Sequence, residues 1–263
     1  MARFVTEELD DGLAILTLNR PERRNAIGME LADDLVDAVR RAAENPQARA
    51  VLLRGAGGTF SVGGDVKGMA RGEGGDVPVD HRVSELRRVM DVSRLLHDMR
   101  KPTVAALDGA AAGGGLSLAL ACDLRIAAKS TKITTAFAKV ALPGDFGGTW
   151  LLTRLVGSAK ARELFFCCPL LTADEAYAHG LVTRVVPDDQ LQKAAYDLAM
   201  SLAHGPTVTL GYMKQNLNLA EIASFEMSLD AEALQQTRAM STADHKEAAR
   251  AFVEKRAPVF KGA

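Results

Sequence analysis

The chain has 263 residues, of which 48% are hydrophobic and 25% are charged, and its 32 basic and 33 acidic side chains leave a formal net charge of -1. This is the composition of an ordinary globular protein, and it excludes a disordered chain, a collagen-like repeat and a disulfide scaffold. Because clustered basic side chains hold nucleic acid, a charge near zero gives no reason to expect a nucleic-acid partner.

Three features of the sequence indicate where in the cell the protein is found: the N-terminal segment, the longest apolar stretch and the cysteines. The first eight residues lack the basic and then apolar run of a signal peptide. Residues 104–122 are interrupted by Asp108 and three successive glycines, so we expect no membrane span. Cys122, Cys167 and Cys168 show no Cys-x-x-Cys spacing, and the five histidines are scattered. We therefore expect a cytoplasmic protein with reduced thiols and no metal.

Strand and helix periods alternate along the first half of the chain. Strands are predicted at 14–18, 51–53, 103–107 and 124–127, and helices at 29–43, 84–99 and 116–122. Parallel strands need crossover connections, which are usually helical, so this order predicts an α/β core with a largely parallel sheet.

The second half of the chain is mainly helical. Thr172 and Glu175 have the spacing of a capping box, and Gly180 suits the end of that short helix. Further helices are predicted at 191–203, 207–219 and 244–256. We predict a core at 1–200 that carries the ligand site, followed by a helical region at 201–263. The glycine-rich, charged segment 71–76 is expected to be an exposed loop.

Two glycine-rich turns, at 60–66 and 111–115, each follow a predicted strand. The second turn opens a helix, whose free amides and positive dipole end favour negative charge. Neither turn has the pattern of a phosphate-binding loop or a dinucleotide fingerprint, so a nucleotide cofactor is not expected. Taken alone, these glycines are explained equally well by tight turns and close packing of a helix on the sheet.

The ordered set of motifs along nearly the whole chain resembles the crotonase superfamily, also called the enoyl-CoA hydratase/isomerase family. The matching blocks are 19–26, 60–65, 101–106, 112–115, 121–127, 147–149, 175–176, 180–182 and 254–260. The resemblance implies the ClpP/crotonase fold, an α/β spiral of strand-strand-helix units with a C-terminal helical region. That region would form a homotrimer or a dimer of trimers and cover the active site. An acyl-CoA thioester would be the substrate, with coenzyme A as part of it and no permanently bound cofactor.

The resemblance also assigns site residues. The amides of Gly64 and Gly114 would hold the thioester oxygen as an enolate forms. Contacts to coenzyme A would fall on Arg24, Ala26, Val62, Gly63, Gly64, Asp65, Val66, Gly113 and Gly114. Arg24 is also explained as a solvated charge after a turn. Lys255 and Arg256 could reach a neighbour's coenzyme A, although a simple surface role explains them equally well.

Hydratases of this superfamily use two glutamates, and this chain has neither. Ser117 stands at the first position and Phe137 at the second. Asp145 lies in a segment, 144–150, that resembles the branch of the superfamily that shifts double bonds and includes 1,2-epoxyphenylacetyl-CoA isomerase. There an aspartate acts as acid and base, and an apolar pocket would raise its pKa. That pocket could be formed by Phe137, Leu142, Phe146 and Trp150.

Several interpretations remain open at this level. Asp145 could simply cap a helix that begins at residue 146 or 147, because Asp is a favoured N-cap residue. The leading hypothesis is an isomerase with Gly64, Gly114 and Asp145 as the catalytic groups. The alternatives are a hydratase, another crotonase reaction such as decarboxylation or thioester hydrolysis, and a non-catalytic subunit that binds acyl-CoA.

Overall fold

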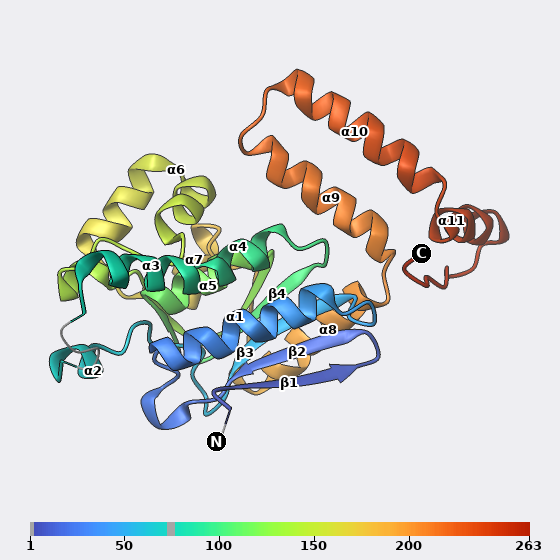
Figure 1. Cartoon of the computed structure of the whole chain (residues 1–263). Coiled ribbons are helices and arrows are strands. Elements are labelled where there is room, and N and C mark those ends of the chain that lie inside the picture. The colour runs from blue at the N-terminus through green and yellow to red at the C-terminus, as the bar shows by residue number, and fades with distance from the viewer. Residues whose placement is uncertain (1–2, 73–76) are drawn as a thin grey trace.

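The computed structural model describes residues 3–72 and 77–263 (Figure 1). Most of the loop predicted at 71–76, and with it the prediction that this loop is exposed, lies outside the described residues. Among the helices that are described, none is both long and apolar enough to cross a membrane.

A six-stranded sheet forms the centre of the molecule, in the order β1-β2-β3-β4-β6-β9. Its strands are β1 (Val5–Asp10), β2 (Leu13–Leu18), β3 (Ala50–Gly55), β4 (Thr103–Leu107), β6 (Leu124–Ala128) and β9 (Arg184–Val186). β1 pairs with β2 in the antiparallel sense, and every other neighbouring pair is parallel. All five residues of β4 are buried, as expected for a parallel strand that is covered on both faces. The predicted parallel α/β core is confirmed.

Helices cover both faces of this sheet, because successive side chains of a strand point to opposite sides. Leu53 packs in one buried cluster with α1 (Met29–Glu44), α4 (Asp91–Asp98) and α5 (Gly114–Ala121). Leu52 packs in another cluster with α8 (Leu191–Ala203). The side of α8 that meets the sheet carries small residues, which allow the close approach. They are Ala195, Ala199 and Ala203.

A smaller, second sheet lies beside the first, with the order β5-β7-β8. Its strands are β5 (Ala110–Ala112), β7 (Lys132–Thr134) and β8 (Leu171–Thr172). β8 leads into α7 (Ala173–Ala178), where the predicted capping box of Thr172 and Glu175 is formed. The remaining core helices are α2 (Val66–Ala70), α3 (Val79–Val89) and α6 (Gly148–Cys167), with short 3-10 turns at Pro21–Arg23, Phe137–Val140 and Asp188–Gln190.

The C-terminal region consists of α9 (Thr207–Ala220), α10 (Phe225–Met240) and α11 (Ala243–Glu254), which extend away from the core (Figure 1). One buried side chain fastens α9 to the core. Lys214 Nζ donates to Asp123 Oδ2 at 2.9 Å and to the carbonyl of Leu96 at 2.8 Å. The division into 1–200 and 201–263 stays a prediction, and α8 runs through residue 200 to Ala203.

Candidate active site

A buried hydroxyl holds the first glycine-rich turn against the segment that contains Arg24 and Ala26. Ser61 Oγ donates to the carbonyl of Asn25 at 2.7 Å and accepts from the amide of Gly63 at 3.1 Å. The Asn25 side chain, which is fully buried, donates to the carbonyls of Ala56 and Thr59. The two segments assigned to coenzyme A are therefore fixed to each other by side chains.

The two glycine-rich turns, distant in sequence, lie side by side. Ser61 and Ala111 form a parallel bridge between them. A Cβ on Gly63, where φ is +83°, would lie 2.6 Å from the carbonyl oxygen of Ala112 and 3.1 Å from the amide nitrogen of Gly114. Glycine is required here both for the positive φ and for the close approach. The structure thus brings Gly63, Gly64, Gly113 and Gly114 together.

Within the described part of the chain, two amides at this point donate no hydrogen bond. Among the hydrogen bonds of the described residues, none is donated by the amide of Gly64 or Gly114. Gly114 is the first residue of α5, and amides in the first turn of a helix lack intrahelical acceptors. The positive end of the α5 dipole lies at the same point. The arrangement offers two backbone donors to an oxygen that gains negative charge.

The carboxylate of Asp145 lies close to Gly114. A Cβ placed on Gly114 would be 2.9 Å from Asp145 Oδ1. This oxygen is buried and has no hydrogen-bond partner among the described residues. Burial raises the pKa of Asp145 to about 6, because a charged carboxylate is poorly solvated there. Asp145 is thus a buried carboxyl group with a raised pKa close to Gly114.

The capping alternative for Asp145 is not supported by the contacts. α6 begins at Gly148, its N-cap residue is Gly147, and no side chain makes a capping hydrogen bond. The loop is instead shaped by positive φ angles of +125° at Gly144, +47° at Phe146 and +76° at Gly147. A left-handed phenylalanine is uncommon, and such strained residues cluster at functional sites.

The apolar surroundings predicted for Asp145 are formed in part. Phe146 is 4% exposed, with Cδ2 3.2 Å from a Cβ on Gly114, and Phe137 lies near Gly113 and stacks on Phe165. The ring of Trp150 packs against His97 and Arg154 and lines a cavity that also includes Gly147, and its part in the Asp145 pocket stays a prediction.

The two positions at which hydratases of the family carry glutamates have no carboxylate in this chain. Ser117 is 2% exposed, and its hydroxyl donates to the carbonyl of Gly113 at 3.3 Å. That hydroxyl lies 2.3 Å from where a Cβ on Gly148 would stand, so the start of α6 packs tightly on α5. Ser117 therefore serves close helix packing, and Phe137 offers no titratable group.

The remaining predicted residues differ in what they can offer a ligand. Arg24 is exposed in a left-handed conformation, with φ of 53°. Ala26 is buried, Val62 is half-buried and Val66 is exposed at the start of α2. For these three residues, only Val66 presents a largely open side chain, so contacts to Ala26 and Val62 would rely on the backbone.

The side chain of Asp65 is already engaged within the protein. It caps α2 by accepting from the amide of Gly68 at 3.0 Å, and it binds Arg20 at 3.2 Å and Arg23 at 2.7 Å. The Gly68 amide, and after it Arg23, lower its pKa. Asp65 can therefore contribute a backbone group to a ligand, while its carboxylate stabilises the start of α2 and binds Arg20 and Arg23.

Sequence reasoning missed Ser61 and Asn25 as the residues that fix this turn. Both lie inside blocks that the resemblance had marked, and a short polar residue between Phe60 and two glycines was the available signal. Within residues 3–72 and 77–263, no group of three or more His, Cys, Asp or Glu side chains could hold a metal ion.

Comparisons with known proteins agree with this geometry. The model of a family described as enoyl-CoA hydratase/isomerase matches residues 8–263. The chain is 38% identical over 262 residues to 1,2-epoxyphenylacetyl-CoA isomerase of Escherichia coli (strain K12), with 100% of both chains covered. It is 34% identical to trans-2-decenoyl-[acyl-carrier-protein] isomerase of Streptococcus mutans, covering 97% of this chain and 96% of that protein.

Solved structures give the same result. A putative enoyl-CoA hydratase/isomerase from Mycobacterium abscessus superimposes with a TM-score of 0.93 at 33% identity, covering 98% of this chain and 100% of that one. A putative enoyl-CoA hydratase from Streptomyces coelicolor A3(2) gives 0.94 at 33% identity, covering 99% and 95%. The similarity extends over the whole chain, including α9 to α11.

Proposed function

The chain belongs to the enoyl-CoA hydratase/isomerase family, and we propose that within it the protein shifts a double bond of an enoyl-CoA through an enolate. The predicted crotonase-like fold with a C-terminal helical region is confirmed by the solved relatives. The single observation that carries the proposed reaction is the buried Asp145 Oδ1, which has no hydrogen-bond partner among the described residues and lies close to Gly114 at the start of α5.

The reaction would proceed in two proton transfers. The thioester oxygen accepts hydrogen bonds from the amides of Gly64 and Gly114. Asp145 removes a proton from the carbon next to the thioester of a 3-enoyl-CoA, and the electron pair moves onto that oxygen and the double bond. Asp145 then returns the same proton to the far carbon, which leaves a 2-enoyl-CoA. No atom is gained or lost, so one carboxylate suffices.

The electrostatics of the site suit both transfers. Each oxyanion donor is typically worth a factor of about 10² to 10³ in rate. A pKa of about 6 leaves most Asp145 side chains charged at neutral pH and still basic enough to take a proton. Coenzyme A would enter as part of the substrate, with the exposed Arg24 available to its phosphates.

A hydratase is the second candidate, because several relatives carry that description. A probable enoyl-CoA hydratase of Rhodobacter capsulatus is 34% identical and covers 97% of this chain. Against it, water addition in the family uses two glutamates, and here Ser117 and Phe137 occupy their positions. A non-catalytic subunit that binds acyl-CoA would also explain those two replacements, but it leaves the buried Asp145 carboxylate without a purpose.

The test is to incubate the enzyme with 3-enoyl-CoA and 2-enoyl-CoA panels, including thioesters of aromatic origin, and to follow product mass and conjugated-enoyl absorbance. We expect a shift of the double bond without a change of mass. A gain of one water would favour the hydratase. Binding of every thioester without turnover would favour the non-catalytic subunit.

We further propose a homotrimer or a dimer of trimers. Large apolar side chains on the C-terminal helices are left open to solvent in the single chain. They are Leu217, Phe225, Phe252 and Val253, which are 70%, 80%, 86% and 80% exposed. Sedimentation at micromolar concentration should give three or six chains, and a monomer would contradict the proposal. The free thiols of Cys122, Cys167 and Cys168 fit the reducing cytoplasm, where we place the enzyme.

A further inference from the structure

The loop that carries Asp145 has few backbone hydrogen bonds of its own. Within the described part of the chain, none of the amides of residues 144–147 donates to a backbone carbonyl. The carbonyl of Asp145 accepts from the amide of Gly148 at 3.0 Å. Just before the loop, Leu142 and Pro143 are exposed and give it no buried support. The position of the loop therefore depends on the side chains that pack against it.

One aromatic ring contacts this loop at both of its ends. A Cβ on Gly144 would lie 3.3 Å from Phe165 Cε1, and a Cβ on Gly148 would lie 3.8 Å from Phe165 Cζ. Because neither glycine has a side chain, the ring packs directly on the backbone of the loop. Phe165 is itself half-buried and packs against the main core cluster. The ring thus connects the loop to the core.

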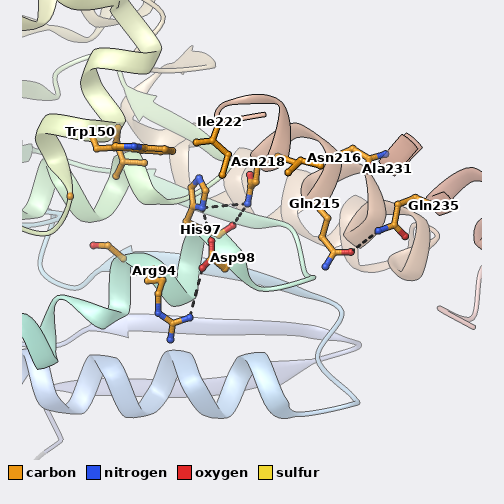
Figure 2. A pocket seen from close by; sticks show the side chains of 14 residues that line it. Arg94, His97, Asp98, Trp150, Gln215, Asn216, Asn218, Ile222, Ala231 and Gln235 are labelled. Carbon is orange, nitrogen blue, oxygen red and sulfur yellow. Dashed lines mark hydrogen bonds and ion pairs between the residues drawn. The ribbon is translucent and has the colours of Figure 1, made fainter. Parts of the chain in front are cut away.

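A sharp bend in α6 brings this ring back to the loop. Gly157, in the middle of α6, has a φ of +75° and a ψ of +161°, which are not helical. The first half of α6 leaves the loop, and the second half returns to it. The two halves carry aromatic rings to different neighbours. Trp150, in the first half, faces His97 at a centroid distance of 5.4 Å (Figure 2), whereas Phe165, in the second half, meets the loop.

Buried contacts fix the end of α6 from two sides. Thr135 is 4% exposed, and its Oγ1 donates to the carbonyl of Leu164 at 2.6 Å. The Phe165 ring stacks on Phe137 with a centroid distance of 5.8 Å and an angle of 5° between the planes. Phe137 Cε1 would in turn lie 3.9 Å from a Cβ on Gly113. The Phe165 ring is therefore held between the Asp145 loop and the ring that borders the second glycine-rich turn.

The pKa of Asp145 reports how well this packing keeps water away. Burial alone raises it to about 6, without a contribution from a charged side chain. Of the elements around Asp145, α5 contains no charged residue, and Lys139 of the 3-10 turn at Phe137–Val140 is exposed. The charged side chains of α6 have other partners: Arg154 pairs with Glu221, Lys160 pairs with Glu163, and Arg162 donates to Ser158.

We propose that Phe165 is a positioning residue for the proton transfer, which holds the Asp145 loop in place at Gly144 and Gly148 and shields the carboxyl group from water. The ring acts through the loop and touches no reacting atom. The inference rests on the proposed function, because it takes Asp145 as the group that moves the proton. A displacement of about 1 Å at a reacting group can cost a factor of about 10² in rate.

Urea unfolding tests the shielding without any assay of turnover. A shielded carboxylate destabilises the folded protein when it is charged, so Asp145→Asn should stabilise more at pH 8 than at pH 4. This difference is measured in the wild type, in Phe165→Ala, in Phe165→Leu, which keeps most of the apolar volume, and in Phe166→Ala. The last is the matched control, because Phe166 is 74% exposed.

We expect the pH-dependent difference to fall by at least half in Phe165→Ala, to recover in part in Phe165→Leu, and to stay unchanged in Phe166→Ala. A ring that only stabilises the fold would lower the midpoints at both pH values and leave the difference intact. That result would overturn the proposal.

Kinetics with a 3-enoyl-CoA tests the positioning. Phe165→Ala should lower kcat at least tenfold with KM within threefold of the wild type, and the acid limb of kcat/KM should move to lower pH. Phe165→Leu should lie between the two, and Phe166→Ala should match the wild type. A change confined to KM, or an acid limb that stays in place, would contradict the assignment. If the wild type turned over no 3-enoyl-CoA, the proposed function would fail, whereas the urea measurement would still decide whether Phe165 shields Asp145.

Discussion

Asp123 and Asp145 both lie at ends of core helices, and they differ in the number of hydrogen bonds that their carboxylates accept. Asp123 Oδ2, after α5, accepts from the amide of Thr103 at 2.7 Å, from the Thr103 hydroxyl at 2.9 Å and from Lys214 Nζ at 2.9 Å. Asp145, before α6, has a buried oxygen with no partner among the described residues. The oxygen of Asp123 is occupied by three donors that stabilise the fold, whereas Asp145 is the carboxylate that we propose for proton transfer.

The strongest test of this contrast is Asp145→Asn. An amide of the same shape cannot take the proton, so we expect turnover of a 3-enoyl-CoA to fall by a factor of about 10² to 10⁴. Binding of coenzyme A, measured by calorimetry, should be unchanged.

Asp123→Asn serves as the matched control. At low temperature, this variant should retain turnover within a few fold of the wild type. Its midpoint of thermal unfolding should be lower than that of the wild type. If the two variants had the same effect on turnover, the contrast between the carboxylates would be lost.

The next largest effect is expected at Lys214. Lys214→Met removes the buried ammonium that joins α9 to Asp123 and to the carbonyls of Leu96 and Lys101. We expect the free energy of unfolding to fall by about 3 kcal/mol, at the low end for a broken buried pair, because Thr103 still satisfies Asp123. Urea unfolding measures this.

A double variant isolates the pair. Combining Lys214→Met with Asp123→Asn should cost less than the sum of the two single changes. Additive effects would mean that the two side chains do not stabilise each other.

The same Asp145→Asn change should stabilise the fold at alkaline pH. The folded pKa of about 6 lies above the usual 3.8, so above pH 6 the folded protein holds a charge that the unfolded chain solvates better. Removing that charge should add about 2 kcal/mol at pH 8. The gain should shrink as the pH falls from 6 to 4 and vanish below about pH 3, where the carboxyl group is protonated in both the folded and the unfolded state. Urea midpoints at pH 4 and 8 test this, and a gain independent of pH would refute it.

The smallest effect concerns the wild-type enzyme. Because Asp145 must be charged to accept a proton, kcat/KM should decline about tenfold per pH unit below about 6. An aspartate with ordinary solvation would keep the rate constant down to about pH 4. A profile with its acid limb near 4 would therefore place the proton transfer on another group or show that Asp145 is well hydrated.

The sequence predicted the elements whose burial pattern is regular. The strand at Thr103–Leu107 and the helix at Leu191–Ala203 were predicted with the observed bounds, because both are apolar on the face that meets the core. α10 was missed, since none of its residues is buried in the single chain and it has no apolar face to detect. The helix predicted at 84–99 is divided into α3 and α4 at Met90.

The site was predicted less completely, because its contacts are not local. The resemblance named Gly64, Gly114 and Asp145, but no pattern in the sequence shows that Ser61 pairs with Ala111. Trp150 was assigned to the Asp145 pocket from its nearness in sequence, and the structure places its ring against His97. These assignments depend on how distant helices pack, which short-range periodicity does not encode.

The contact between Ser117 and Gly148 limits which side chains can be exchanged at this site. A glutamate at 117 would need room where the hydroxyl already meets the first turn of α6, and a glutamate at 137 would have to replace a ring stacked on Phe165. Neither single exchange leads through a well-packed intermediate. Introducing the glutamate pair therefore requires simultaneous changes in α5, α6 and the loop between them.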